Sequence, residues 1–156
     1  MHSGIEKILA EVYIRDLPRR RVCVVAPTTP LGEVYRLLDE EHSVAVLVCD
    51  GTELVGIFTE RDILNRTALE GSPDTPITEL MSSIKASLTS NHRLADAIES
   101  MHESGYRHIP LQDDEGAKPG LVGGRDILKL IADYYPETLL NLPPRLHQQL
   151  IRPEGG

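Results

Sequence analysis

The sequence of 156 residues contains no tryptophan, one phenylalanine and only two cysteines. Because aromatic residues make up 4% of the chain, its hydrophobic core must be built from Val, Ile, Leu and Ala. The longest apolar run, Val44 to Cys49, is far shorter than the roughly 20 residues that a helical membrane span requires. The N-terminus lacks a basic segment followed by an apolar one, so no secretory signal is predicted. We therefore expect a cytoplasmic protein that does not enter a membrane.

Positive charge is also scarce, with 16 Lys and Arg against 24 Asp and Glu and a formal net charge of −8. A field of this sign repels nucleic acid, although it is compatible with a small cationic pocket. The hydrophobic fraction of 40% and the charged fraction of 26% are typical of a globular domain and exclude wholesale disorder. Cys23 and Cys49 lie in apolar runs, as buried free thiols of a reducing compartment do. A single long-range disulfide between them is the alternative.

Motifs for metal binding or covalent catalysis are absent from the sequence. The six histidines and two cysteines show no paired spacing such as Cys-x-x-Cys, so no metal site is predicted. The chain has no Walker loop, no Gly-x-Ser-x-Gly elbow and no His-Glu-x-x-His motif. We therefore predict neither an enzyme nor a required cofactor.

An internal repeat dominates the sequence. Ile14-Arg15-Asp16-Leu17 is echoed by Ile77-Thr78-Glu79-Leu80, at an offset of 63 residues from Ile14 to Ile77. Gly56 to Leu64 is echoed by Gly120 to Leu128, at an offset of 64 residues from Gly56 to Gly120. Between these segments, four apolar residues at helical spacing recur at the first offset: Leu31, Val34, Tyr35 and Leu38 correspond to Leu94, Ala97, Ile98 and Met101. The chain therefore contains two copies of one unit.

Each copy is predicted to form a strand, a helix, two further strands and a closing helix. The Asp50-Gly51 pair is typical of a tight hairpin turn, and Pro30 suits the first turn of a helix. In the first copy we expect strands at 22–26, 43–49 and 54–58, a closing helix at 61–69 and a linker at 71–76; the second copy is expected to run from Ile84 to Ile131. The predicted fold class is α/β (α+β), as two tandem β-α-β-β-α repeats.

One such unit buries too little apolar surface to be stable alone, so the two copies should pack on each other. We divide the chain into an N-terminal segment with the first repeat (1–71), a linker with the second repeat (72–133) and a C-terminal tail (134–156). Within the tail, residues 139–151 carry several leucines and are expected to dock on another surface.

The segment Thr59-Glu60-Arg61-Asp62 joins a strand to the closing helix and has two interpretations. The structural one is a helix start, because Thr is a good N-cap and an acid suits the first helical turn. The functional one is a ligand site, because free backbone N–H groups can bind phosphate and a carboxylate can accept hydrogen bonds from two ribose hydroxyls.

The repeat and the Gly56-Ile57-Phe58-Thr59-Glu60-Arg61-Asp62 motif resemble a tandem pair of CBS domains, named for cystathionine β-synthase, over about Val12 to Ile131. The resemblance implies a pseudo-two-fold pair with two clefts for adenosine-containing ligands: AMP, ADP, ATP or S-adenosylmethionine. It further implies a regulatory module that signals by conformational change, often as a homodimer through the closing helices, 62–69 and 126–131. No catalytic or transport domain accompanies the repeats, so an effector would be a separate protein.

The resemblance also assigns residues to the clefts. The first cleft would use Asp62 for ribose, the Thr59 hydroxyl for phosphate, Ile57 and Phe58 near the base, and an opposite wall of Ile84, Lys85 and Ala86. The second cleft would use Asp126, Leu121 and Val122 against Ile14, Val22 and Cys23. Here Gly123 replaces the expected Thr or Ser, and Arg107 and His108 could compensate for the lost hydroxyl.

Two alternatives remain open at this stage. Arg19-Arg20-Arg21 is either a solvated connector or a set of phosphate contacts at the entrance of the second cleft. The whole protein is either a ligand-responsive module or a ligand-free scaffolding protein whose clefts are relics. The complete motif of the first copy favours the former, and Gly123 favours the latter.

Overall fold

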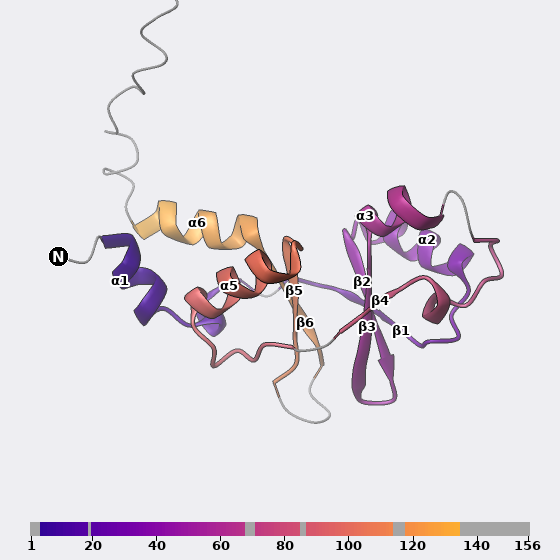
Figure 1. Cartoon of the computed structure of the whole chain (residues 1–156), viewed down its shortest axis with the longest axis horizontal. Helices are drawn as coiled ribbons and strands as arrows, with labels where there is room; N and C mark the ends of the chain where they lie inside the picture. The colour runs from indigo at the N-terminus through magenta and orange to yellow at the C-terminus, as the bar shows by residue number, and fades with distance from the viewer. Residues whose placement is uncertain (1–3, 19, 68–70, 85–86, 114–117, 135–156) are drawn as a thin grey trace, which may run out of the picture.

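The computed structural model describes residues 4–18, 20–67, 71–84, 87–113 and 118–134. Two α/β halves lie side by side, with their strands in the middle of the molecule and their helices toward its two ends (Figure 1). The first half contains β1 (Cys23–Val25), α2 (Leu31–Glu40), β2 (Ala45–Asp50), β3 (Glu53–Thr59) and α3 (Glu60–Asp62), which continues as the π-helix η2 (Ile63–Thr67). The second half contains α5 (Leu94–Ser104), β5 (His108–Leu111), β6 (Gly120–Gly123) and α6 (Gly124–Tyr134). The predicted tandem α/β repeat is confirmed.

The first half contains a four-stranded sheet in the order β1-β2-β3-β4, where β4 is Ser82–Ser83. β1 pairs parallel with β2, and the other two pairings are antiparallel. The sheet is buried on both faces, which explains why β2 reads as a continuous apolar run. Its alternate residues serve different cores: Val46 and Val48 face the first half's helices, whereas Ala45, Leu47 and Cys49 face the second half.

A tight hairpin joins β2 to β3 as predicted, but its two turn residues are Gly51 and Thr52, because Asp50 still pairs with Glu53 at the end of β2. Gly51 has a φ of 61°, a conformation that glycine adopts without the steric cost that a Cβ atom would bring. A register shift between Val48 and Cys49 lies close to this turn.

The opening of the second repeat differs from the prediction. We expected the first strand of the second repeat to begin at Ile84. Instead, the strand at this place is β4, which ends just before Ile84 and pairs with β3 of the first half. A single parallel bridge between Leu88 and Leu111 remains at the expected place, and it corresponds to the Val24–Leu47 pair of the first half. The second sheet, within the described residues, is therefore the β5–β6 hairpin.

The segments that precede the two repeats are exchanged between the halves. Before the first repeat, η1 (Ile14–Asp16) binds the second half, with the Ile14 N–H donating to His92 O at 2.9 Å. Before the second repeat, η3 (Ile77–Glu79) binds the first half, with the Ile77 N–H donating to Thr29 O at 2.8 Å. The two hydrogen bonds are related by the repeat offset, so they follow the pseudo-two-fold symmetry.

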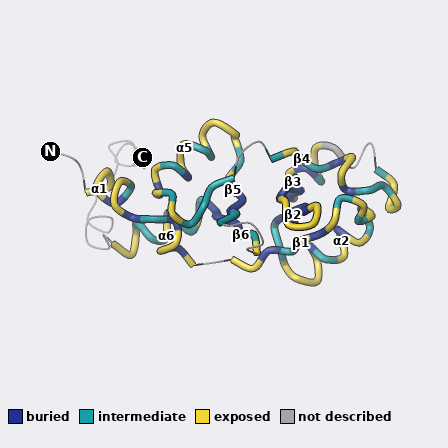
Figure 2. The backbone as a smooth tube through the Cα atoms, turned by 90° about the horizontal axis from the view of Figure 1, so that it is seen from below, coloured by how far each residue is buried: buried dark blue, intermediate teal, exposed yellow. Residues whose placement is uncertain are grey.

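Three clusters of buried side chains result from this arrangement. One joins α1 (Gly4–Glu11) and η1 to the helices of the second half, and one joins η3 to the first half. The third lies between the halves and includes Val22, Leu47, Ile57 and Leu121. Figure 2 shows the buried segments gathered on the central strands. The packing therefore ties the two repeats into one structure.

The two closing helices are unlike. α3 has three residues and passes directly into the π-helical turn, whereas α6 is regular over 11 residues. The predicted helix at 61–69 is therefore irregular and is described only as far as Thr67. Among the described helices, none is long and apolar enough to span a bilayer. The tail prediction for 139–151 lies outside the described residues.

Candidate functional site

The carboxylate of Asp62 is buried at the junction of β3 and α3. Its Oδ2 accepts hydrogen bonds from the Thr59 backbone N–H at 2.8 Å and from the Thr59 hydroxyl at 3.1 Å. This is the acid-to-N-cap bond of a helix start, so the structural interpretation of the motif is correct in itself. From the residues that the structure describes, the Oδ1 atom accepts one long bond, of 3.4 Å from the Ser82 hydroxyl. Both carboxylate oxygens are thus held by neutral donors.

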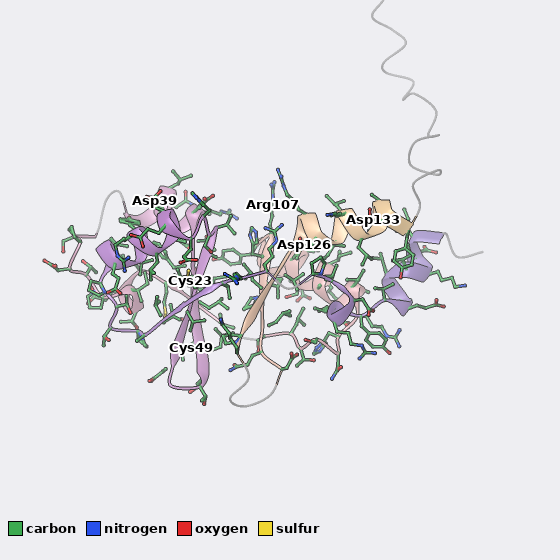
Figure 3. The ribbon with its side chains drawn as sticks, turned by 180° about the vertical axis from the view of Figure 1, so that it is seen from behind. Cys23, Asp39, Cys49, Arg107, Asp126 and Asp133 are labelled. Carbon is green, nitrogen blue, oxygen red and sulfur yellow. The ribbon has the colours of Figure 1, made fainter. Side chains whose placement is uncertain are left out.

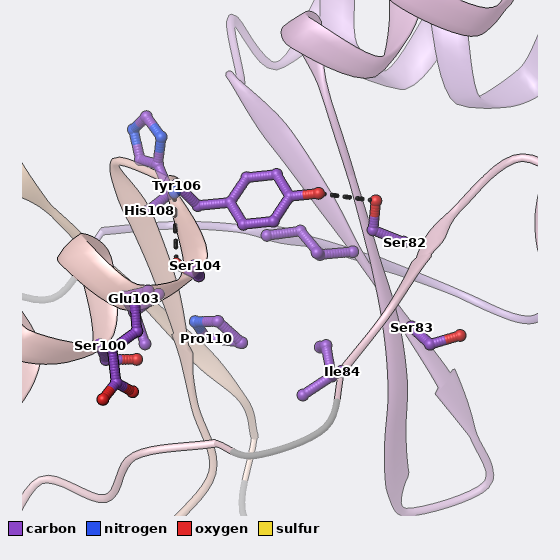
Figure 4. Close-up of a pocket in the computed structure, with 11 residues that line it drawn as sticks. Ser82, Ser83, Ile84, Ser100, Glu103, Ser104, Tyr106, His108 and Pro110 are labelled. Atoms are coloured by element: carbon purple, nitrogen blue, oxygen red, sulfur yellow. Dashed lines mark hydrogen bonds between the residues drawn. The ribbon is translucent and has the colours of Figure 1, made fainter.

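Tyr106 closes the space beside Asp62. Its hydroxyl lies 3.0 Å from Ser82 Oγ, and Figure 4 shows the ring reaching from the second half to Ser82 on β4. Because Ser82 donates toward Asp62, the phenol of Tyr106 is the donor in the second bond. A chain of hydrogen bonds from Tyr106 through Ser82 to Asp62 therefore connects the two halves.

Tyr106 and Ser82 line a cavity of about 450 Å³, which we name the first-cleft cavity, and they also line a separate cavity of about 230 Å³ that includes Asp62. The volume of the first-cleft cavity is within the range of small-molecule sites. Apolar side chains line it from both halves, and its polar lining consists mainly of hydroxyl groups: Ser82, Ser83, Ser100, Ser104 and Tyr106. Of the described residues that line it, Glu103 carries a negative charge and none is Lys or Arg. The cavity therefore suits the uncharged part of a ligand.

His108 also lines this cavity, on β5. Burial lowers the pKa of its imidazole below the ordinary value of 6.5, and the nearby Arg20 guanidinium lowers it further. The side chain is therefore mainly neutral at pH 7. It can form hydrogen bonds with a ligand at that pH but adds little charge.

The second carboxylate, Asp126, has a different partner. Arg20 donates to both of its oxygens, from Nε to Oδ2 at 2.8 Å and from Nη2 to Oδ1 at 3.1 Å. The Gly123 backbone N–H donates to Oδ2 at 3.3 Å, as the Thr59 N–H does to Asp62. With no hydroxyl at Gly123, the guanidinium of Arg20 supplies the remaining hydrogen bonds to Asp126. Figure 3 labels Asp126 beside Arg107.

A cavity of about 670 Å³ adjoins this ion pair, and we name it the second-cleft cavity. Arg20, Arg107 and Arg125 line it, together with Gly123 and Gly124 at the start of α6. Arg107 and His108 also line a third cavity of about 570 Å³ that includes Thr59 and Arg61. The sequence assigned Arg107 and His108 to the second cleft, and both line its cavity as well as the third cavity.

The other predicted site residues separate into two groups. Ile57, Ile84, Leu121 and Val22 belong to the apolar cluster between the halves. Four others pack into the cores of the individual halves: Phe58 and Cys23 in the first, Val122 and Ile14 in the second. The pleat of the strands explains the separation, because neighbouring residues point to opposite faces of a sheet. Lys85 and Ala86 lie outside the described residues.

Sequence reasoning missed the roles of Ser82 and Tyr106, and it considered Arg20 only as part of a solvated connector or as a phosphate contact. Ser82 and Arg20 both lie in the segments that precede the repeats, close to equivalent positions. Because their sequence positions are nearly equivalent, the repeat could have predicted that each lies near the carboxylate of one cleft. The repeat predicts nothing for Tyr106, because its counterpart, at an offset of 64, is His42 in a turn with a φ of 48°.

The two cysteines are free thiols in the structure, with Cys49 buried and Cys23 half-buried. Burial raises the pKa of both thiols above the ordinary value, so they are protonated at neutral pH. Within the described residues, no group of three His, Cys, Asp or Glu side chains could hold a metal ion.

A pseudo-symmetric pair of β-α-β-β-α units, with a carboxylate at the same turn in each, defines a tandem-repeat regulatory module. The chain belongs to the CBS-domain family: the family model, described as "CBS domain", matches residues 14–68 and 72–133. The resemblance inferred from the repeat and its motif is thereby confirmed.

Sequence relatives share this region. The chain is 28% identical over 123 residues to a 17.7 kDa protein of Acidianus ambivalens, covering 78% of this chain and 74% of the relative. It is 31% identical over 101 residues to the CBS domain-containing protein YhcV of Bacillus subtilis, covering 64% and 72%. Some other relatives are longer, and the chain spans only 28% of one protein from Methanocaldococcus jannaschii.

Solved structures show the same fold. A CBS-domain containing protein from Agrobacterium tumefaciens is 27% identical, with a TM-score of 0.66 over 77% of this chain and 99% of the other. CBSX2, solved in complex with AMP, is 20% identical with a TM-score of 0.66, over 78% and 97%. The CBS domain pair of MJ0100, solved with 5′-methylthioadenosine and S-adenosyl-L-methionine, is 19% identical with a TM-score of 0.68, over 79% and 98%.

Proposed function

We propose that this module binds an adenosine-containing ligand in the first cleft and signals to a partner protein by a change in conformation. The observation that carries the proposal is Asp62, a buried carboxylate whose hydrogen-bond donors among the described residues are neutral and which lines a cavity that shares Tyr106, Ser82 and Ser104 with the first-cleft cavity. Ribose hydroxyls can replace the long bond from Ser82 to Asp62, since both are neutral O–H donors. The proposal includes no catalytic step and no required cofactor.

The geometry suggests how such a ligand would lie. Ile57 and Ile84 offer apolar contact for the base, and Asp62 accepts the ribose hydroxyls once Tyr106 and Ser82 have moved aside. Phosphate groups would extend toward Arg61 and Arg107, which line the third cavity. The AMP complex of CBSX2 and the S-adenosyl-L-methionine complex of the MJ0100 pair support this ligand class.

Signalling follows from the use of both halves. Tyr106 belongs to the second half and Ser82 pairs with the first, so a ligand that separates them acts on their relative arrangement. A ligand shifts a conformational equilibrium only by the difference in its affinity for the two states. The Tyr106–Ser82 hydrogen bond is a contact that differs between the two states, because a bound ligand would displace it.

Thermal unfolding with AMP, ADP, ATP and S-adenosylmethionine tests the proposal. A ligand at about 100 times its dissociation constant should raise the free energy of unfolding by roughly 2.7 kcal/mol. Adenine base, which lacks the ribose, is the control and should have a much smaller effect. If no adenosine compound raises the unfolding temperature, the proposal is wrong, and the second candidate, a ligand-free scaffolding protein, takes its place. Gly123 and the occupied Asp126 favour that candidate.

The proposal includes a homodimer formed through the closing helices. Leu64 and Leu128 are equivalent in the two repeats and are 80% and 68% exposed, which is unusual for leucines that recur on one surface. Aspartate at both positions is expected to convert a dimer into a monomer, as measured by light scattering at micromolar concentration. Ile5→Asp, at another exposed apolar residue, is the control and should leave the mass unchanged. A monomeric parent protein, with and without ligand, would contradict the dimer.

A further inference from the structure

We propose that Arg20 is a built-in occupant of the second cleft, which keeps this cleft closed to uncharged adenosine compounds as long as the guanidinium holds Asp126. The inference rests on the proposed function, because it concerns which of the two clefts takes the ligand. Asp126 has the position in the second repeat that Asp62 has in the first, and Arg20 engages both of its oxygens. A ribose at Asp126 would therefore have to share carboxylate oxygens that already accept from the guanidinium.

The strengths of the competing bonds favour Arg20. Both a ribose hydroxyl and the guanidinium form charge-assisted hydrogen bonds with a carboxylate, but the guanidinium adds a full positive charge and a fork geometry that matches both carboxylate oxygens. Arg20 is also part of the chain, so it binds without the loss of translational and rotational freedom that a free ligand suffers. Asp126 is only 12% exposed, and this burial limits the access of water to the pair. Among the described residues, the donors to Asp62 in the first cleft are the neutral groups of Thr59 and Ser82, so none of them competes in this way.

The backbone holds Arg20 at this place. On one side, Leu17 is buried in the core cluster of the second half. On the other side, Val22 is buried in the cluster between the halves. The short connector between them is therefore fixed at both ends, and Arg20 lies on it beside Asp126. Removal of Arg20 from Asp126 would disturb the connector, which joins η1 to β1.

The second-cleft cavity adds selectivity for charge. Arg107 and Arg125 line the cavity together with Arg20. A phosphate group that enters this space can compete with Asp126 for the Arg20 guanidinium, because both are anions that bind arginine in a bidentate manner. An uncharged nucleoside cannot compete in this way. The second cleft therefore discriminates against adenosine much more strongly than the first cleft does.

Calorimetric titration of adenosine, which carries no phosphate, tests the inference on the full chain. The parent is expected to bind one adenosine per chain, and Arg20→Met, which keeps an unbranched apolar side chain but lacks the guanidinium, is expected to bind two. The double variant Arg20→Met/Asp126→Asn should return to one, because the carboxylate of the second cleft is gone. Arg36→Met is the matched control, since it breaks an exposed arginine pair with Glu40 on α2, and it should stay at one.

Each combination of stoichiometries decides the matter. If the parent and Arg20→Met each bind one adenosine per chain, this inference is wrong, while the proposed function stands. If the parent binds two adenosines per chain, this inference is also wrong. If the parent binds none and Arg20→Met binds one, the result supports this inference and contradicts the assignment of the first cleft. No binding of adenosine to either protein overturns this inference, and the unfolding experiment with AMP, ADP, ATP and S-adenosylmethionine then decides the proposed function.

Discussion

Replacement of Asp62 by alanine is expected to weaken adenosine binding by at least 100-fold and to destabilise the protein by about 2–3 kcal/mol. The loss of binding follows from two hydrogen bonds to a charged acceptor, together worth about 3 kcal/mol or more. The loss of stability follows from the missing helix-start bond and from the buried Thr59 hydroxyl, which loses its acceptor. Isothermal calorimetry measures the first effect, and urea unfolding measures the second.

Two further variants separate affinity from stability. Asp62→Asn keeps an oxygen acceptor for the Thr59 donors but removes the charge, so it should cost less stability than Asp62→Ala while it still weakens binding. Asp39→Ala removes an exposed carboxylate from α2, which Figure 3 labels at a distance from Asp126, and it should change neither quantity much. If Asp62→Ala binds adenosine as the parent does, Asp62 is not the ribose carboxylate.

Alanine at Ile14 or Ile77 is expected to cost about 2–5 kcal/mol of stability, which is typical for a buried isoleucine. Ile14 is 2% exposed and Ile77 is not exposed at all, although both lie in short connecting segments outside the repeats' strands and longer helices. Ile14 belongs to the core cluster of the second half and Ile77 to that of the first. Each substitution therefore leaves a cavity in the half that lies across the interface. Urea unfolding measures the cost.

The exchange of connectors also predicts how the protein unfolds. Because each half needs a segment from beyond its own repeat, the two halves should unfold in one cooperative transition, and both variants should shift the same midpoint. Ile98→Ala, on the exposed side of α5, is the matched control and should cost less than 1 kcal/mol, about the effect of a surface substitution. Two separate transitions, with each variant affecting only one, would contradict the coupling.

Much of the fold could be predicted from the sequence because its signals are local. The apolar residues of α2 and α5 recur at helical spacing, and the tight hairpin is indicated by two adjacent residues, Asp50 and Gly51. The start of α3 is likewise local, since Thr59 and Asp62 are three residues apart. Because the two copies correspond at an offset of 63 or 64 residues, each predicted element of one copy could be checked against its counterpart in the other.

The irregular elements could not be predicted in this way. The β4 strand of two residues has no periodicity, and its partner, β3, belongs to the other repeat. The π-helical turn after Asp62 breaks a pattern that in α6 continues as a regular helix. In both cases the local sequence is compatible with more than one conformation, and packing against the rest of the molecule selects one.

The candidate site also divides into features that the local sequence encodes and features that depend on packing. By itself the sequence determined the two carboxylates, Asp62 and Asp126, and the missing hydroxyl at Gly123, because a motif needs only neighbouring residues. Only the tertiary structure decided that Arg20 binds Asp126, a residue 106 positions away, and that Tyr106 meets Ser82. These contacts depend on how the two halves are oriented. That orientation is set by burial of the central cluster and of the exchanged connectors, and burial of this kind leaves no periodic trace in the residues that it brings together.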